Sequence, residues 1–343
     1  MSMPSTPPSP LIAQLDELIR RDPAQRGLIG TEREFGALCP GHLAAAAAEL
    51  AENARSVGIV TGFFIPGGQP PAAETDGPLG TLFLAAVLEK LGVESHVITD
   101  NHCHPALQAA AEAMEFPNDR VHQTVVNINE TGETFFQSAP GKQLTHLIAL
   151  ERVGPCHTTA SLTGQRRSGA VPLEGFQQHV PVTVHDRCHN MRGEAMDAYS
   201  GNLHRLFEFA SQSRSDIKTI GIGDGANEIG MGSIPWENLH RRLEGDHAGR
   251  VPCRIATDWT IVTGTSNWGG YALAAAIAHL KDAPQHLAPY DAAQQFGVLE
   301  HFVQHGPAVD GVTRRQEPTV DGLPFLTYIQ PLEGIRQLLG VDA

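Results

Sequence analysis

The sequence predicts an α/β fold in which a doubly wound, mostly parallel sheet carries helices on both of its faces. Apolar runs of strand length recur along the chain, and helical patterns lie between most of them. The runs are almost continuously apolar, as expected of parallel strands that are buried on both faces. The 35 Gly and 24 Pro are too many for a helical bundle and suit a chain with many tight turns.

The expected elements begin with two helices, at Leu11 to Arg21 and at Gly41 to Ser56, because leucine, isoleucine and alanine recur there at helical spacing. Strands and helices then alternate. The expected strands are Val57–Gly62, Glu94–Thr99, Val121–Ile128, His146–Leu150, Ile217–Ile222 and Trp259–Gly264. The expected helices are Leu79–Leu91, Pro105–Met114, Tyr199–Gln212, Trp236–Glu244 and Gly269–Lys281. Ligands of such a sheet bind beyond the carboxyl ends of its strands, so we expect the site there.

A tail and two long segments depart from this alternation. Residues 1–10 (MSMPSTPPSP) are rich in proline and serine and predict a disordered tail, so that residues 11–343 form a single domain. The segment at about 155–193 is polar and turn-rich and predicts an inserted loop, and the segment 307–324 is similar. Loops of this length in compact domains usually cover or form a binding site.

The composition argues against several classes of partner. The formal net charge is -14, and a field of that sign repels nucleic-acid phosphates and anionic lipid. The sequence has no apolar run of the roughly 18 residues that a membrane span needs. The five cysteines are scattered and odd in number, which favours a reducing compartment, and we expect a cytoplasmic protein. The alanine- and glycine-rich helices could bury a face in a homo-oligomer, but no pattern requires one.

Polar residues follow the first predicted strand, in the segment 62–80 (GFFIPGGQPPAAETDGPLG). Glu74, Thr75 and Asp76 lie just before Pro78, a residue that suits the first turn of a helix. Thr75 and Asp76 could cap that helix and leave its N–H groups free for an anion. Because α/β proteins bind ligands at such strand–loop–helix junctions, these residues are candidate site residues as well as candidate caps.

A glycine-rich acidic loop, GIGDGANEIGMG at 221–232, follows another predicted strand. Its glycines allow close approach to a ligand, and Asp224, Asn227 and Glu228 supply oxygen atoms for a metal ion or for acid–base chemistry. The dinucleotide fingerprint does not fit, because Glu228 takes its third glycine position, so we expect no nucleotide cofactor. The loop also resembles the magnesium-binding loop of haloacid-dehalogenase-type phosphatases. Those enzymes need a nucleophilic aspartate in a D-x-D motif, and here Asp100 is followed by His102 where the second aspartate should be.

Two further strand ends carry candidate residues. Glu151 and Arg152 follow the predicted strand at 146–150. They could form a structural ion pair, or they could act as a base or metal ligand beside a clamp for a substrate carboxylate. Asn267 lies in the segment 263–271, where it could cap the following helix or hydrogen-bond to a ligand.

Several linked segments resemble the D-glutamate cyclase family. They are TGFF…PPAAETDGPLG at 61–80, HLIALER at 146–152, NMRGE at 190–194 with IGIGDGANEIGMG at 220–232, and TSNWGGYALAAAI at 265–277, and VDGVTRRQEPTVDGLP at 309–324 also fits. The resemblance covers roughly residues 28–340 and implies a Rossmann-like domain that dehydrates D-glutamate to 5-oxo-D-proline. In family members the Glu-Arg element, here at 151–152, is followed almost directly by the NMRG element, here at 190–193. The stretch from about Cys156 to Cys188 is therefore expected to be an insertion, and we expect it to lie over the site.

The implied reaction suggests roles for these residues. Closing the lactam needs a neutral amine, a polarised γ-carboxyl group and a proton for the departing oxygen, so carboxyl groups can serve as base and acid. We expect Glu151, Asp76 and Glu228 to be catalytic. We expect Asp224, Glu228 and Glu151 to hold a divalent cation, Mg²⁺ or Mn²⁺, that relieves the repulsion of a dianionic amino-acid substrate. The expected substrate-binding residues are Glu74, Thr75, Arg152, Arg192, Asn227 and Asn267.

Two other classes of function remain open on the sequence alone. A metal-dependent hydrolase or phosphatase would use the same acidic loop on a small anionic substrate. A non-catalytic amino-acid-binding module would bind its ligand tightly without turnover. The excess of carboxylates argues against that module, because a simple binder of anions prefers arginines and helix amino ends.

Overall fold

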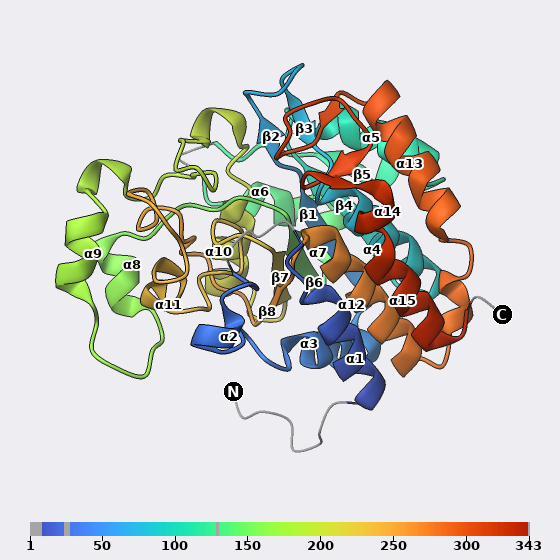
Figure 1. Cartoon of the computed structure of the whole chain (residues 1–343), viewed down its shortest axis with the longest axis horizontal. Helices are drawn as coiled ribbons and strands as arrows, with labels where there is room; N and C mark the ends of the chain where they lie inside the picture. Colours follow the sequence, from blue (N-terminus) through green and yellow to red (C-terminus); the bar gives the residue numbers. More distant parts are fainter. Residues whose placement is uncertain (1–8, 24–27, 128–129, 342–343) are drawn as a thin grey trace.

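The computed structural model describes residues 9–23, 28–127 and 130–341, and its centre is a six-stranded sheet (Figure 1). The strand order is β5-β4-β1-β6-β7-β8. Every neighbouring pair runs parallel, which confirms the predicted fold class. In chain order the strands are β1 (Ser56–Thr61), β4 (Glu94–Thr99), β5 (Val121–Gln123), β6 (His146–Leu150), β7 (Lys218–Gly223) and β8 (Trp259–Val262).

The direction in which strands are added reverses between β1 and β6. From β1 the chain adds β4 and β5 on one side of the sheet, and then crosses back to add β6, β7 and β8 on the other. This is the strand order of a Rossmann-type sheet, in which ligands bind in the crevice beyond the carboxyl ends of the strands at the switch point. The topology therefore directs attention to the loops that follow β1, β6 and β7.

Helices and loops bury both faces of the sheet. Alternate residues of β6 serve opposite cores, because Ile148 and Leu150 belong to one apolar cluster and Leu147 and Ala149 to the other. The first cluster includes residues of α1 (Pro10–Ile19), α3 (His42–Asn53), α4 (Pro78–Lys90), α5 (His104–Ala113), α12 (Ser266–Leu280), α13 (Ala292–His305) and α15 (Gln330–Leu339). The second includes residues of α6 (Glu133–Gln137), α10 (His204–Ser213) and α11 (Trp236–His240). Short helices α2 (Glu32–Phe35), α7 (Ala139–Gln143) and α14 (Phe325–Tyr328) lie in connecting segments.

Within the described ranges, no helix combines the length and the apolar character that crossing a membrane would take.

Helices α4 and α12 pack against each other and are almost completely buried. Residues 78–88 of α4 and 266–278 of α12 are all buried, because both helices are apolar on every side. A Cβ at Gly80 would lie 2.6 Å from Asn267 Cα, and a Cβ at Gly270 would lie 2.6 Å from Gly80 O, so only glycine permits this approach. Both helices begin beyond the carboxyl edge of the sheet, which brings two buried helix N-termini to the predicted site.

Predicted and observed elements agree most closely where the apolar pattern is strongest. β4 and β6 have the predicted bounds, β1, β7 and β8 differ from them by one or two residues, and β5 ends at Gln123. The predicted end of β5, residue 128, lies outside the described residues, as do residues 1–8 of the predicted tail. Helix α1 begins within that tail, at Pro10. Helices α13 and α15 lie outside every predicted range.

Short strands fasten the segment 307–324 to the loop that follows β1. β2 (Phe64–Ile65), β3 (Ala72–Glu74) and β9 (Ala308–Val309) form a three-stranded sheet, and β10 (Thr319–Val320) pairs with β11 (Leu323–Pro324). The fully buried Asp310 accepts hydrogen bonds from the N–H groups of Val312, Thr313 and Gly322 and from Thr319 Oγ1, all at 2.7–2.8 Å. The segment is therefore held in one conformation beside the end of β1.

The segment predicted to be an inserted loop is folded as well. It contains α8 (Thr159–Gly164) and α9 (Leu173–His179), which Figure 1 shows at the end of the molecule beyond α11. Leu162, Phe176 and Val180 form a small apolar cluster with Trp236, the first residue of α11. This separate core fixes the position of the segment.

Two buried histidines make the stability of the protein depend on pH. His157 is 1 % exposed and His204 is 6 % exposed, and burial first and Arg254 second lower the pKa of each from 6.5 to about 3. In the unfolded chain both take up a proton as the pH falls below 6.5, whereas in the native protein both stay neutral until about pH 3. Their contribution to stability is therefore complete above pH 6.5 and is lost as the pH falls toward 3.

We expect the free energy of unfolding to fall by about 2 kcal/mol for each of these histidines between pH 7 and pH 5. Urea denaturation at the two pH values measures this change in the wild-type protein and in a His157→Gln/His204→Gln variant. The variant should lose that part of the pH dependence and keep the part due to carboxyl groups and to other histidines, such as His146, whose pKa burial lowers to about 4. An equal pH dependence in both proteins would contradict the assignment.

Candidate active site

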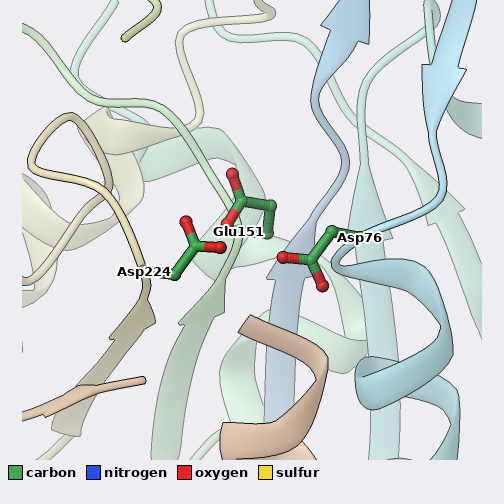
Figure 2. A group of neighbouring side chains, drawn as sticks. All are labelled: Asp76, Glu151 and Asp224. Carbon is green, nitrogen blue, oxygen red and sulfur yellow. The ribbon is translucent and has the colours of Figure 1, made fainter. Parts of the chain in front are cut away.

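Three carboxylates meet beyond the carboxyl ends of the strands (Figure 2). Asp76 precedes α4, Glu151 follows β6, and Asp224 follows β7. One oxygen of each lies within 4.8 Å of the others, and the three residues are only 2 %, 4 % and 2 % exposed. This acidic cluster could hold a metal ion. It joins three segments that the sequence presents as separate motifs.

Glu151 lies on a constrained backbone between the other two carboxylates (Figure 2). Its φ of 49° is in the left-handed region, which is uncommon for a residue with a Cβ atom. Ser266 Oγ donates a hydrogen bond of 2.6 Å to Glu151 Oε2. Gly77 beside it has a φ of 99°, and a Cβ there would lie 2.8 Å from Glu151 Cβ. Strained residues persist where packing determines their conformation, and they gather at functional sites.

Asp76 and Asn267 cap each other's helices. Asp76 accepts hydrogen bonds from the N–H groups of Ser266 (2.8 Å) and Asn267 (2.9 Å), which begin α12. Asn267 Oδ1 in turn accepts from the N–H groups of Gly77 (2.9 Å) and Gly80 (2.7 Å) at the start of α4. Asp76 also accepts from Gly77 N at 3.0 Å, but Gly77 is the N-cap of α4, so the cap that the sequence predicted for Asp76 on α4 is not formed and Asp76 caps α12 instead.

The acidic cluster brings three carboxyl groups together in a buried place. Burial first, and then Asp321 and Glu151, raise the pKa of Asp76 well above its ordinary value, although the N–H groups of Asn267 and Ser266 oppose the rise. Buried carboxylates at this separation need a proton or a cation to relieve their repulsion. Because the donor atoms are all oxygens, the residues fit a cation that prefers oxygen ligands.

A cavity of about 500 Å³ adjoins the acidic cluster through Glu151. This volume is typical of small-molecule sites. Of the predicted site residues, Glu74, Arg192 and Asn227 line the cavity together with Glu151. Asn227 Oδ1 is buried and accepts no hydrogen bond from the described residues, so it could accept one from a ligand. Apolar parts of the wall come from Phe63, Phe64, Ile65, Met191, Leu243, Val251 and Val312.

Arg152 is not among the residues that line the cavity. The residue is 1 % exposed, and its Nη2 lies 2.5 Å from Asp100 Oδ2 and 3.0 Å from Ser200 Oγ, while Nη1 donates to Gly62 O at 2.7 Å. Burial raises the pKa of Asp100, but the charge and the hydrogen bond of Arg152 lower it by more than burial raises it. The pKa of Asp100 is therefore below its ordinary value. The structure thus places Arg152 in the ion pair that the sequence left open, with Asp100 as the partner instead of Glu151.

Three other predicted site residues, Glu228, Thr75 and Asn267, belong neither to the cavity wall nor to the acidic cluster. Glu228 Oε1 accepts a hydrogen bond from Gly225 N at 2.8 Å and so braces its own loop, and Asp76 takes the place in the acidic cluster that we expected for Glu228. Thr75 Oγ1 donates to Thr319 O at 2.8 Å. Asn267 Nδ2 donates to Thr75 O at 3.2 Å, so this amide uses both ends within the protein. The structure gives these side chains supporting contacts where the sequence suggested contacts with substrate or metal.

The expected insertion, from about Cys156 to Cys188, contributes no residue to the cavity wall, and the chain reaches the cavity just after it, in the segment NMRGE at 190–194. Asn190, Met191 and Arg192 line the cavity, whereas α8 and α9 contribute no lining residue. We expected this insertion to lie over the site; the apolar cluster with Trp236 holds α8 and α9 against α11, away from the cavity wall. The segment 307–324 does form part of the cavity, as its length suggested, through Gly311, Val312 and Arg314.

Three basic residues of the cavity wall have no counterpart among the predicted site residues: Arg242, His247 and Arg314. Arg242 follows Arg241 in a polar stretch, where two successive arginines are typical of an exposed surface. The two arginines differ only in the folded protein, where the Arg241 side chain is exposed and Arg242 is 4 % exposed. A signal for Arg314 was available, since it lies within the family-like segment 309–324.

A known protein family matches most of this chain. A family profile described as "D-glutamate cyclase-like, C-terminal" matches residues 15–167 and 178–336. The unmatched stretch, 168–177, is shorter than the insertion expected at about 156–188. The chain is 29% identical to the Homo sapiens protein "D-glutamate cyclase, mitochondrial" over an alignment of 362 residues. This alignment covers 94% of this chain and 51% of the human protein. The chain thus spans about half the length of this relative, and it belongs to the D-glutamate cyclase-like family.

Proposed function

We propose that the chain is a dehydrating cyclase that converts D-glutamate, or a close analogue, to 5-oxo-D-proline and water with the help of Mg²⁺ or Mn²⁺. The observation that carries the proposal is the buried cluster of Asp76, Glu151 and Asp224 beside a cavity of about 500 Å³, in a chain that belongs to this family. The name of the human relative supports the same activity.

The reaction closes a five-membered ring. The α-amine nitrogen forms a bond to the γ-carboxyl carbon, and a bond from that carbon to one of its oxygens breaks. The oxygen leaves as water with two protons that the α-ammonium group gives up. Holding glutamate folded, with the amine close to the γ-carboxyl carbon, removes part of the entropic barrier, which is a role for the shape of the cavity.

The residues of the cavity suit the proton transfers. Glu151 belongs to the acidic cluster and also lines the cavity, so we assign it the removal of a proton from the substrate ammonium group. Asn227 Oδ1 and the Glu74 carboxylate are the acceptors that would orient the amine. Glu151 can then pass this proton to the departing oxygen, whereas Asp76, which does not line the cavity, would act on the reaction through the acidic cluster.

The acidic cluster fits a divalent cation that prefers oxygen ligands, and Asp224 and Glu151 would hold it with Asp76. When bound, such a cation offsets the negative charge of the carboxylates and polarises a carboxyl group as a Lewis acid.

The phosphatase alternative receives less support from the structure. Its nucleophile would be Asp100, the aspartate that follows β4, but this carboxylate lies 2.5 Å from Arg152 Nη2 and also accepts a hydrogen bond of 3.0 Å from Gly201 N. Asp100 is 0 % exposed and does not line the cavity. A nucleophile needs access to its substrate, and Asp100 lacks it.

The direct test is an assay of the purified chain after treatment with a chelator. D-glutamate and L-glutamate are incubated with and without Mg²⁺ or Mn²⁺, and 5-oxoproline is followed by chiral chromatography, with a phosphomonoester in parallel. We expect 5-oxo-D-proline from D-glutamate only, its loss after metal removal and its return when the cation is restored. Phosphate release without any lactam would overturn the proposal, and tight binding without turnover or metal dependence would favour a binding module.

A further inference from the structure

A buried arginine of the cavity wall has N–H donors that its contacts within the protein do not use. Arg242 lines the cavity and is 4 % exposed. Its Nη1 donates to Thr31 Oγ1 at 3.0 Å, and its Nη2 donates to Phe35 O at 3.1 Å and to Gly36 O at 2.7 Å. A guanidinium group has five N–H donors, so these bonds leave some of them unused. Its Nε is buried and forms no hydrogen bond with the described residues.

The three acceptors of Arg242 are neutral, so they do not balance its charge. Among the residues that the structure describes, no carboxylate forms an ion pair with Arg242. Burial first, and Arg241 second, lower its pKa, and only Glu32 raises it. Glu32 Oε1 is itself held by Arg20 Nη1 at 2.5 Å. A buried charge without a counter-charge lowers the stability of the protein, and an anion bound beside it would relieve this effect. The cavity wall at Arg242 therefore favours an anionic group of a ligand.

The cavity thus offers both signs of charge to one ligand. Its acidic groups are Glu74, Glu151, Glu194 and Glu244, and its arginines are Arg192, Arg242 and Arg314. Arg314 has a φ of 61°, and its Nη2 lies 3.8 Å from Glu194 Oε2, too far for a hydrogen bond. A zwitterionic amino acid matches this arrangement, with its amine toward the carboxylates and a carboxylate toward the arginines.

We propose that Arg242 binds the α-carboxylate of the substrate, an assignment that rests on the proposed cyclase function. The γ-carboxyl group loses its negative charge as the lactam forms, and a fixed cation bound to it would stabilise the starting state and oppose the reaction. The α-carboxylate stays anionic in the substrate, the transition state and the product. A permanent buried guanidinium is therefore matched to the α-carboxylate, where it anchors the substrate and leaves the γ-carboxyl group to the acidic cluster.

A comparison of two substrates tests the assignment. D-isoglutamine keeps the amine and the γ-carboxylate of D-glutamate but has a neutral amide in place of the α-carboxylate. We expect kcat/KM of the wild-type enzyme to be about 100-fold higher for D-glutamate than for D-isoglutamine, mainly through KM. In Arg242→Gln this preference should fall to within about tenfold, and Arg242→Lys, which keeps the charge but not the planar fork, should lie between the two.

Arg241→Gln is the matched control, because it removes the same charge from the preceding residue. Arg241 is exposed, does not line the cavity and lies over the Phe35 ring at 4.9 Å. We expect this variant to keep the wild-type preference for D-glutamate. Equal loss of preference in both variants would overturn the assignment, since it would point to a change of conformation around Phe35.

The wild-type enzyme tests the proposal even if Arg242→Gln does not fold. Equal use of D-glutamate and D-isoglutamine by the wild type would show that no residue recognises the α-carboxylate, and the proposal would be wrong. If neither compound forms a lactam, the proposed function fails instead. Calorimetric binding of D-glutamate and D-isoglutamine to the wild type and to Arg242→Lys then still decides whether the α-carboxylate is recognised through Arg242.

Discussion

Replacing Asp224 by asparagine is expected to reduce kcat for 5-oxo-D-proline formation by about 100-fold to 1,000-fold and to weaken the binding of Mn²⁺. Asp224 is 2 % exposed and contributes one of the three oxygens that lie within 4.8 Å of one another. Asparagine keeps the shape of the side chain but removes its charge. Product chromatography at saturating D-glutamate measures kcat, and electron paramagnetic resonance measures free Mn²⁺ in the same samples.

The stability of this variant provides a second, opposite signature. Because the cluster packs like charges together in a buried place, removing one of them should leave the free energy of unfolding unchanged or raise it. Asp119→Asn is the control, since Asp119 is exposed and precedes β5 at the amino edge of the sheet, and it should behave as the wild type in each assay. Full activity in Asp224→Asn would remove the acidic cluster from the chemistry.

Replacing Arg152 by glutamine is expected to lower the free energy of unfolding by about 3–5 kcal/mol. The change leaves Asp100, which is 0 % exposed, as a buried carboxylate without the guanidinium that now lies 2.5 Å away. Urea denaturation at pH 7 measures the loss. Arg187→Gln is the matched control, because its ion pair with Asp197 is 4.0 Å long and its side chain is 54% exposed, so its removal should cost less than about 1 kcal/mol.

A double-mutant cycle separates the structural role of Arg152 from a role in substrate binding. The Arg152→Gln/Asp100→Asn protein should be more stable than the sum of the single changes predicts, because the second change removes the unpaired charge. An arginine that binds a substrate carboxylate would instead raise KM in the single variant and leave stability nearly intact. That result would restore the role that the sequence suggested for Arg152.

The sequence reveals most of the fold because its parallel strands are buried on both faces. The run HLIAL has no polar alternation that could blur its ends, and β6 has the predicted bounds, His146–Leu150. Helix α13 was within reach of the same reasoning, since Val298, Leu299 and Phe302 recur at helical spacing after the capping residue Asp291.

The candidate site is only partly readable from the sequence, and the reason is physical. Parallel strands end at one edge of the sheet, so Glu151 and Asp224 are brought together by topology that the pattern predicts. The pattern does not say which of two neighbouring side chains turns toward the cavity. Glu151 and Arg152, like Arg241 and Arg242, are adjacent in sequence, yet in each pair only one residue lines it.

The reciprocal caps of Asp76 and Asn267 make two segments that are distant in sequence depend on each other. The segments TDGP and TSNW lie about 190 positions apart, yet each supplies the group that completes the other's helix. A substitution that removes the cap in one segment leaves buried N–H groups unsatisfied in the other. We therefore expect substitutions in one segment to require compensating substitutions in the other. Chimaeras within this family should therefore exchange the two segments together, and a crossover point between them will be tolerated only when both parents carry the same pair.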